Sequence, residues 1–280
     1  MSKIKIFMCC HKQYETLPPL CEAIQCGSAL NPKIENAVYD DHGENISLKN
    51  REYCELTAHY YAWKNVKADY YGFCHYRRFF AVENCTKRPY TAKLKLSEKE
   101  RGFYLGNEEY WQDLIKKYEI LVPRSEDMGL PAGEHYLTSK NHYLEDLHLF
   151  LDILFKEAPW LMETAKGYLL QNRQYFCNMF IMKNTYFFEY CEALFSILEK
   201  FDKQKTLHGD FQSDRTDGYL GELFTGIYID YCCKKGVKIK ELPRLDIVSS
   251  AQKIISGMLF PPESKRRFFA KKIAKTIGGK

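Results

Sequence analysis

The stretch Asp69-Tyr-Tyr-Gly-Phe-Cys-His-Tyr-Arg-Arg-Phe-Phe80 has the composition of a buried strand that ends in basic residues. Tyr70–Cys74 is aromatic or apolar apart from one glycine and contains no strong helix former, so a strand is favoured over a helix. His75, Arg77 and Arg78 follow at the exit of this strand. In an open α/β sheet, ligands bind beyond the carboxyl ends of the strands, so these three side chains are candidate site residues.

Predicted strands alternate with predicted helices over most of the 280-residue chain, an order typical of an α/β fold. Strands are expected at residues 3–9, 70–74, 120–123, 178–182 and 237–242, the last at an edge. Helices are expected at residues 48–65, 108–117, 141–157, 186–201 and 212–231. Loops are expected at residues 18–27, 81–106 and 124–140, the second of them a mobile flap. We therefore predict a single α/β domain with a mainly parallel central sheet flanked by helices.

Arg77 and Arg78 are adjacent, and two guanidinium groups suit a diphosphate because each offers a rigid fork of donors and stays charged. Neighbouring residues of a strand point to opposite faces, so both reach one ligand only if the chain turns there. The ordinary alternative is that one arginine pairs with a structural carboxylate and that His75 is a hydrogen-bonded core histidine.

Five further residues are candidates for lining a ligand pocket. His11 follows the predicted first strand in a polar loop, and Gly27 lets the backbone approach a ligand closely. Asn45 lies in a polar turn, where it either faces the pocket or caps the following helix. Glu55 and His59 are four residues apart on one predicted helix, so they either meet in a pocket wall or lie on a solvated helix face.

Glu222 lies in the first turns of the last long predicted helix, roughly opposite its apolar face. A glutamate in that place is favoured by the helix dipole. Alternatively, it serves as a general base beside a ligand bound at the strand ends. Asp146, Asp214 and Asp217 are rival candidates for such a base.

The basic residues are concentrated at the carboxyl end of the chain. Residues 264–280 contain seven Lys or Arg and no acid, whereas the rest of the chain carries 34 basic and 36 acidic side chains. A broad basic face for nucleic acid is therefore not expected. Phe269, Ile273 and Ile277 recur every four residues among the basic ones, which predicts a basic amphipathic helix on an anionic membrane surface. A disordered, solubilising tail is the alternative.

The predicted location is the cytoplasm, at the inner face of the cell membrane. The amino terminus lacks the apolar core of a signal peptide, and no apolar run is long enough to span a bilayer. The 11 cysteines are then expected to be free thiols. They form no C-x-x-C pair, so no structural metal is expected.

Several motifs in one order make the chain resemble the DUF4422 family over roughly residues 3–232. They are Glu44–Asn50, Tyr53–Thr57, Tyr61–Asn65, Gly72–Phe79, Asn178–Lys183, Tyr190-Cys191 and Arg215-x-x-Gly218-Tyr-Leu-x-Glu222. Members of that family are bacterial glycosyltransferases of capsule, O-antigen and related polysaccharide assembly. The resemblance implies a GT-A-like fold, a UDP-sugar donor carrying galactofuranose or galactose, and a lipid-linked or growing glycan as acceptor.

The resemblance also suggests roles for the candidate residues. His75, Arg77 and Arg78 are expected to hold the diphosphate or orient the donor, Asn178 to face the acceptor or sugar, and Arg215 to pair with Glu222 near the reaction centre. The Asp-x-Asp with which many GT-A enzymes hold Mn²⁺ is missing after the strand at residues 70–74. Cationic side chains can neutralise the leaving diphosphate instead, so no cofactor is expected to be required. Asp40-Asp41 is an alternative site for Mn²⁺ or Mg²⁺, so metal dependence stays open at this point.

We predict a DUF4422-like domain over residues 1–245 and an extension with the basic helix over residues 246–280. The competing function is a non-catalytic nucleotide- or carbohydrate-binding scaffold of a polysaccharide assembly complex. A nucleotidyltransferase or phosphatase that uses the arginine pair is a further enzyme alternative, although the chain lacks a P-loop.

Overall fold

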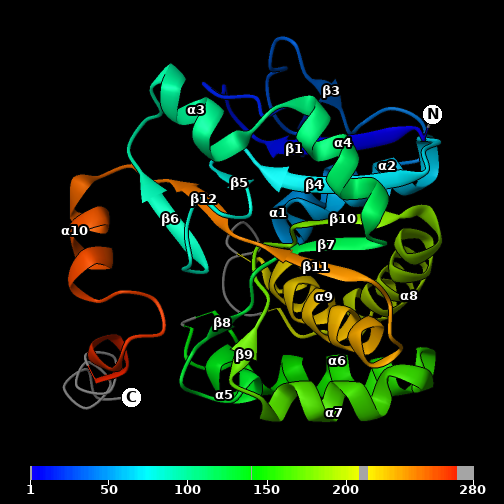
Figure 1. Ribbon diagram of the computed structural model, residues 1–280. Helices are drawn as coiled ribbons and strands as arrows, with labels where there is room; N and C mark the ends of the chain where they lie inside the picture. Colours follow the sequence, from blue (N-terminus) through cyan, green and yellow to red (C-terminus); the bar gives the residue numbers. More distant parts are fainter. Residues whose placement is uncertain (1, 140, 208–213, 270–280) are drawn as a thin grey trace.

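The computed structural model describes residues 2–139, 141–207 and 214–269, and β4 (Tyr70–His75) lies near the centre of its main sheet (Figure 1). The main path of this sheet has the order β11-β7-β10-β4-β1-β2-β3. Its other strands are β1 (Ile4–Cys10), β2 (Cys21–Gln25), β3 (Val38–Tyr39), β7 (Ile120–Pro123), β10 (Phe180–Lys183) and β11 (Ile239–Leu242). The five strands expected from the sequence are confirmed, with β11 at the edge.

Most neighbours in this sheet are parallel, as predicted. β1 runs parallel to β2 and to β4, and β11 runs parallel to β7. β10 is antiparallel to both of its neighbours, β4 and β7. Consequently the end of β1, the end of β4 and the beginning of β10 meet at one edge of the sheet.

A smaller group of strands extends this edge. β5 (Arg78–Phe80) turns back from β4, and β12 (Arg244–Ile247) pairs with β5 and with β6 (Tyr90–Lys93). Two short strands, β8 (Glu126–Asp127) and β9 (Arg173–Gln174), form a separate ribbon.

Helices cover both faces of the main sheet (Figure 1). One side carries η1 (Ser47–Lys49), α1 (Asn50–Tyr53), α2 (Leu56–Asn65), α5 (Ala132–Tyr136), α6 (Leu144–Glu157), η2 (Pro159–Leu161), α7 (Met162–Leu170), α8 (Asn184–Asp202) and α9 (Thr216–Lys234). The other side carries α3 (Glu98–Leu105) and α4 (Glu108–Lys117). The helices predicted at residues 108–117, 141–157, 186–201 and 212–231 correspond to α4, α6, α8 and α9.

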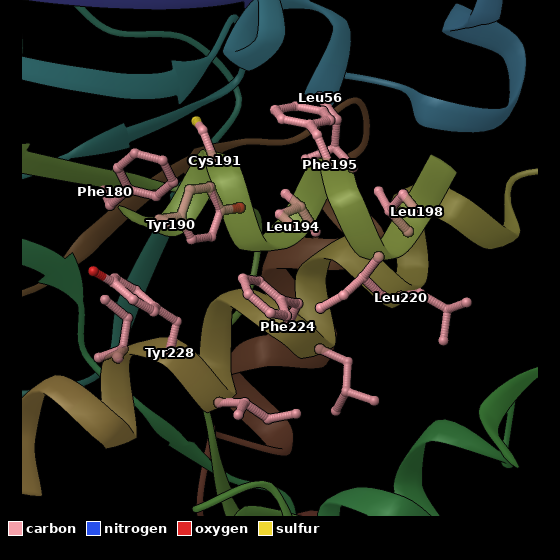
Figure 2. Packing of buried hydrophobic residues seen from close by; sticks show 14 of the residues in the cluster. Leu56, Phe180, Tyr190, Cys191, Leu194, Phe195, Leu198, Leu220, Phe224 and Tyr228 are labelled. Atoms are coloured by element: carbon pink, nitrogen blue, oxygen red, sulfur yellow. The ribbon is translucent and has the colours of Figure 1, made fainter. Parts of the chain in front are cut away.

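The alternation of side chains along β1 produces two cores. Phe7 and Cys9 pack toward α8 and α9, whereas Ile6 and Met8 pack toward α4. Figure 2 shows the larger core, where Tyr190 and Leu194 of α8 meet Phe224 of α9. This aromatic packing fixes the start of α9 against the edge of the sheet where β4 ends.

Three local predictions were wrong. Ala23–Gln25, expected in a loop, belongs to β2, because pairing with β1 satisfies its backbone. The helix expected at residues 48–65 is interrupted at Cys54, whose φ of 51° is left-handed. The flap expected at residues 81–106 contains β6 and α3, which is capped by a reciprocal Ser97–Glu100 capping box.

The carboxyl end carries α10 (Ala251–Leu259), which lies beside β6 (Figure 1). Residues 265–269 are helical, and Ile273 and Ile277 of the predicted basic helix lie outside the described residues. Within the described part of the chain, no helix is both long and apolar enough to span a bilayer.

Candidate active site

A cavity of about 810 Å³ opens at the edge of the sheet where β1 and β4 end. Its lining comes from the ends of β1 and β4, from the Cys54–Glu55 break, from α9 and from residues 246–249. Five of its side chains are cationic at neutral pH: Arg51, Arg77, Arg78, Arg215 and Lys253. The lining carboxylates are Glu55, Glu222 and Asp246. The cavity therefore favours an anionic ligand.

The arginine pair projects into this cavity from a turn. β4 and β5 pair His75 with Arg78, which leaves Tyr76 and Arg77 as the two turn residues. This turn is the feature that allows both arginines to line one cavity.

Neither arginine of the pair is used in a structural ion pair with a described residue. The guanidinium of Arg77 lies 4.9 Å from the ring centre of Tyr76. Arg244 supplies the contrast, because its buried guanidinium contacts Glu126 at 3.1 Å and Asp246 at 2.7 Å. The exposed donors of Arg77 and Arg78 are thus free for an anion.

Two imidazoles line the same cavity. His75 Nε2 donates to the carbonyl oxygen of Cys177 and lies 3.9 Å from Glu55 Oε1. The ring of His11 packs edge-on against Tyr76 at 5.1 Å. Burial lowers the pKa of His11, and the positive charges of Lys12 and Arg77 lower it further. Burial and these neighbouring charges therefore both favour the neutral form of His11.

A strained turn at Cys177 and Asn178 joins the parts of the site. Both residues have left-handed φ values, 78° and 45°, which are uncommon for residues other than glycine. Asn178 is buried, donates to Glu55 Oε1 at 2.8 Å and accepts from Thr225 Oγ1 at 2.9 Å. The expectation that Asn178 faces a ligand was wrong, because both ends of its amide are used to position Glu55 and α9.

Glu222 projects from the first turns of α9, and its Oε2 accepts from the backbone N–H of Cys177 at 2.6 Å. Burial raises the pKa of Glu222 from 4.5 to about 7, and the charge of Glu55 raises it as well. The hydrogen bond from Cys177 opposes this rise. Oε1 makes no hydrogen bond with a described residue, so it can accept a proton from a bound molecule.

Arg215 lines the cavity but does not pair with Glu222, so that part of the prediction was wrong. Its Nε donates to Cys54 Sγ at 3.1 Å, and its guanidinium lies 5.8 Å from the ring centre of Tyr219. The helix break at Cys54 makes this contact possible, because it turns the thiol toward the beginning of α9.

Gly27 and Asn45, both predicted to line the pocket, serve the local backbone instead. Gly27, with φ of 66°, donates to Asp40, and a Cβ at this position would come within 2.4 Å of the Asn50 side chain. Asn45 accepts from the backbone of Ser47 at 3.2 Å, as a turn residue does. Neither residue is part of the cavity lining.

His59 was also predicted to line the pocket, and this was wrong. It is completely buried, with its ring centre 4.0 Å from that of Phe73. Burial lowers its pKa well below the usual value, and neither ring nitrogen has a hydrogen-bond partner among the described residues. It therefore does not pair with Glu55, which contacts Asn178 instead.

The sequence profile of a family described as "Domain of unknown function (DUF4422)" matches residues 5–234. The chain belongs to the DUF4422 family. Among solved structures, this DUF4422 chain is similar to one described as the apo structure of the bifunctional glycosyltransferase WbbM. The two share 30% sequence identity with a TM-score of 0.79, over 88% of this chain and 45% of WbbM. This chain thus spans less than half of WbbM, and a comparison with curated proteins finds no match.

The likeness to WbbM confirms the predicted GT-A-like α/β fold. It does not assign site residues, which rest on the geometry of this DUF4422 chain. The rival bases do not line the cavity: Asp214 accepts from Thr216 N at 2.9 Å, Asp217 is completely buried, and Asp146 is buried on α6.

Two sets of carboxylates in this DUF4422 chain are candidate ligands for a divalent cation. Asp40 accepts from Gly27, Ser28 and Ser47, and Asp41 pairs with Lys33. Within the described residues, the one group of three potential ligands close enough to share an ion is Glu52, Asp202 and Asp217. The ammonium of Lys205 already lies among them, 3.0 Å from Glu52 and from Asp202 and 2.5 Å from Asp217. Neither set fits a catalytic metal at the cavity.

Sequence reasoning missed several residues that line the cavity of this DUF4422 chain: Arg51, Tyr76, Tyr219, Asp246 and Lys253. Tyr76 and Tyr219 lie inside two of the motifs that carry the family resemblance, so a sequence signal for them existed. Asp246 and Lys253 follow the matched region and reach the cavity only because β12 pairs with β5.

Proposed function

We propose that this chain is a glycosyltransferase that moves a hexose from a UDP-sugar to a lipid-linked or growing surface polysaccharide. The observation that carries the proposal is that one cavity holds both arginines that are unpaired within the described part of the chain and a glutamate that can act as a base. Arg77 and Arg78 have no ion-pair partner among the described residues, and Glu222 has a raised pKa. The similarity to WbbM supports the class of activity. Galactose and galactofuranose are the first donor sugars to test.

The basic side chains act on the leaving group. When the bond between the anomeric carbon and the diphosphate breaks, negative charge develops on the departing phosphate oxygens. Arg77 and Arg78 hold these oxygens at the β4–β5 turn, and His75 lies beside them with its ring fixed by Cys177. Donors that are already in place stabilise this charge without a reorganisation step.

Glu222 acts on the nucleophile, with inversion at the anomeric carbon. A carboxylate with a pKa near 7 is partly ionised at neutral pH and is basic enough to accept a proton from a sugar hydroxyl as it attacks. The bond from Cys177 N to Oε2 orients the carboxylate and leaves Oε1 for this proton.

The arginines replace a metal ion in this proposal. Of the lining carboxylates, Glu55 accepts from Asn178, and Asp246 pairs with Arg244. Arg77 and Arg78, in contrast, have no carboxylate partner among the described residues. Fixed cationic side chains and a divalent metal ion can each neutralise the negative charge of a leaving diphosphate.

We further propose that the chain binds the inner face of an anionic membrane through its carboxyl end. α10 has no buried residue, and its Ile255, Met258 and Leu259 side chains are 54%, 68% and 56% exposed. Arg266 and Arg267 follow it closely in the chain. Apolar side chains beside basic ones fit the boundary between lipid headgroups and acyl chains.

Binding of UDP by isothermal titration calorimetry tests the donor site. Arg77→Ala and Arg78→Ala are each expected to weaken UDP binding by about 10- to 100-fold, the value of a charge-assisted hydrogen bond. Arg88→Ala is the matched control, because Arg88 is exposed and its side chain makes no contact with the cavity. UDP affinity that is unchanged in both cavity variants would contradict the proposed donor site.

Turnover separates an enzyme from a binding scaffold. The UDP-sugar that stabilises the chain best in a thermal-shift screen is incubated with candidate glycan acceptors, and released UDP is measured. The proposal requires acceptor-dependent release. Binding of the UDP-sugar without any release would favour the scaffold alternative.

A further inference from the structure

A second cavity, of about 300 Å³, adjoins the first and shares two of its lining residues, Tyr219 and Glu222. The rest of its lining comes from α5, from Ser139, Asn141 and His142, from α7, from residues 174–176 and from Leu223 of α9. These segments are distant in the sequence and meet beside α9. Glu222 therefore lies on the boundary between two cavities.

The chemistry of the second cavity differs from that of the first. No Lys or Arg is among its described lining residues, and Glu222 is its one carboxylate. Its wall is aromatic: the ring centre of His142 lies 4.1 Å from that of Tyr136 and 4.3 Å from that of Tyr219. Burial lowers the pKa of His142, which favours its neutral form. A phosphate group would therefore find no cationic side chain among the described residues of this wall.

Polar groups are interspersed with these aromatic rings. Asn141 and Ser139 line the cavity, and the Asn141 amide makes no hydrogen bond with a described residue. The ring of Phe176 lies on the same wall, edge-on to His135 at 5.9 Å. Aromatic faces suit the C–H surface of a sugar ring, and amide and hydroxyl groups suit its hydroxyls. The volume lies at the lower end of the range for small-molecule sites, which fits a single sugar ring.

We infer that the second cavity is the acceptor subsite and that it holds the terminal, uncharged sugar of the glycan. This inference rests on the proposed function and adds the place and the chemical class of the acceptor. One hydroxyl of that sugar points at Glu222 from the second cavity, while the anomeric carbon of the donor approaches from the first.

The proposed transfer takes place at Glu222, where the two cavities meet. The acceptor O–H bond breaks and its proton passes to Glu222 Oε1. The acceptor oxygen forms a bond to the anomeric carbon, and the bond from that carbon to the phosphate oxygen breaks. Its electron pair leaves with UDP, whose charge is held by the arginines of the first cavity.

The test separates the two cavities by kinetics. The full chain is assayed with the donor identified by thermal shift and with methyl β-D-galactopyranoside and its gluco and manno counterparts as acceptor probes. The variants are Asn141→Ala, Phe176→Leu and their combination. Phe103→Leu is the matched control, because Phe103 is 57% exposed on α3 and lines neither cavity.

Each single variant is expected to raise the acceptor KM about threefold to tenfold, and the combination by more. The donor KM, the Kd for UDP and the slow hydrolysis of the donor without acceptor should stay unchanged, and these measurements also show that the variants fold. An unchanged acceptor KM together with normal UDP binding would overturn the acceptor subsite and leave the proposed function standing.

Two further outcomes are decisive. A wild-type chain that binds UDP but whose UDP release no glycoside accelerates would overturn the assignment of an uncharged terminal sugar. A wild-type chain that does not bind UDP would overturn the proposed function, and the acceptor subsite with it.

Discussion

Glu222→Gln should make the protein more stable and nearly inactive at the same time. The pKa of Glu222 is about 7 in the folded chain against an ordinary value of 4.5. Each pKa unit corresponds to about 1.4 kcal/mol, so holding this side chain ionised costs the folded state up to about 3 kcal/mol. Glu222 lines an open cavity, and solvent there lowers the cost of its charge. We therefore expect Glu222→Gln to raise the free energy of unfolding by about 1–3 kcal/mol at pH 8.

The sign of this effect depends on pH. Between pH 4.5 and 7 the unfolded chain has released the proton and the folded chain still holds it, so the wild-type protein loses stability as pH rises through this window. Glutamine has no proton to lose and keeps an oxygen for the N–H of Cys177. The variant should therefore exceed the wild type in free energy of unfolding at pH 8, and much less so at pH 5.

Activity should change in the opposite direction. A general base contributes about 10²- to 10⁴-fold to the rate, so kcat should fall at least 100-fold in the variant. In the wild type, kcat should rise with pH through about pH 7 as Glu222 loses its proton. Urea unfolding at the two pH values and UDP release measure the two effects.

The matched control is Glu192→Gln, which removes an exposed glutamate from α8. It should leave both measurements unchanged. Near-normal turnover of Glu222→Gln would exclude Glu222 as the base, and a loss of stability at pH 8 would refute the reasoning about its buried charge.

Three other predictions follow from the same structure. Activity should persist in excess EDTA, and a complete loss that Mn²⁺ restores would refute the role given to the arginines. Lys205→Met should lower the free energy of unfolding at pH 7 by about 3 kcal/mol or more, because it removes the ammonium that lies among the carboxylates of Glu52, Asp202 and Asp217; unchanged stability in urea unfolding would contradict this. Deletion of residues 264–280 should reduce co-sedimentation with phosphatidylglycerol vesicles but not with phosphatidylcholine vesicles, and unchanged co-sedimentation would count against membrane binding.

The sequence predicted the parts of the fold that depend on local pattern. The run of aromatic residues in β4 and the periodicity of α4 and α8 are local signals, and these elements form where they were expected. β2 was missed because five residues after a Pro-Pro pair give little pattern, and pairing with β1 decides their conformation.

The site was predictable where its residues belong to one turn, and not where distant segments meet. Arg77 and Arg78 lie beside the strand that carries them, so their place could be inferred. Asn178 contacts Glu55 across more than 100 residues of sequence, and no local pattern shows that its amide is used up. His59 has the spacing of a partner for Glu55, but the aromatic core takes it instead.

The second cavity had no sequence signal, because it exists only where α5, α7 and α9 pack together. Residues 124–140 could be described as a site loop from their composition alone. That Ala132, His135 and Tyr136 line one cavity with Glu222 depends on tertiary contacts.

The most direct test of the account is the structure of the chain bound to UDP. The account predicts that the diphosphate lies in the cavity at the end of β4, with its oxygens within hydrogen-bonding distance of Arg77 and Arg78 and with Glu222 open to the second cavity. A diphosphate bound elsewhere, with both guanidinium groups paired to carboxylates of the protein, would contradict it.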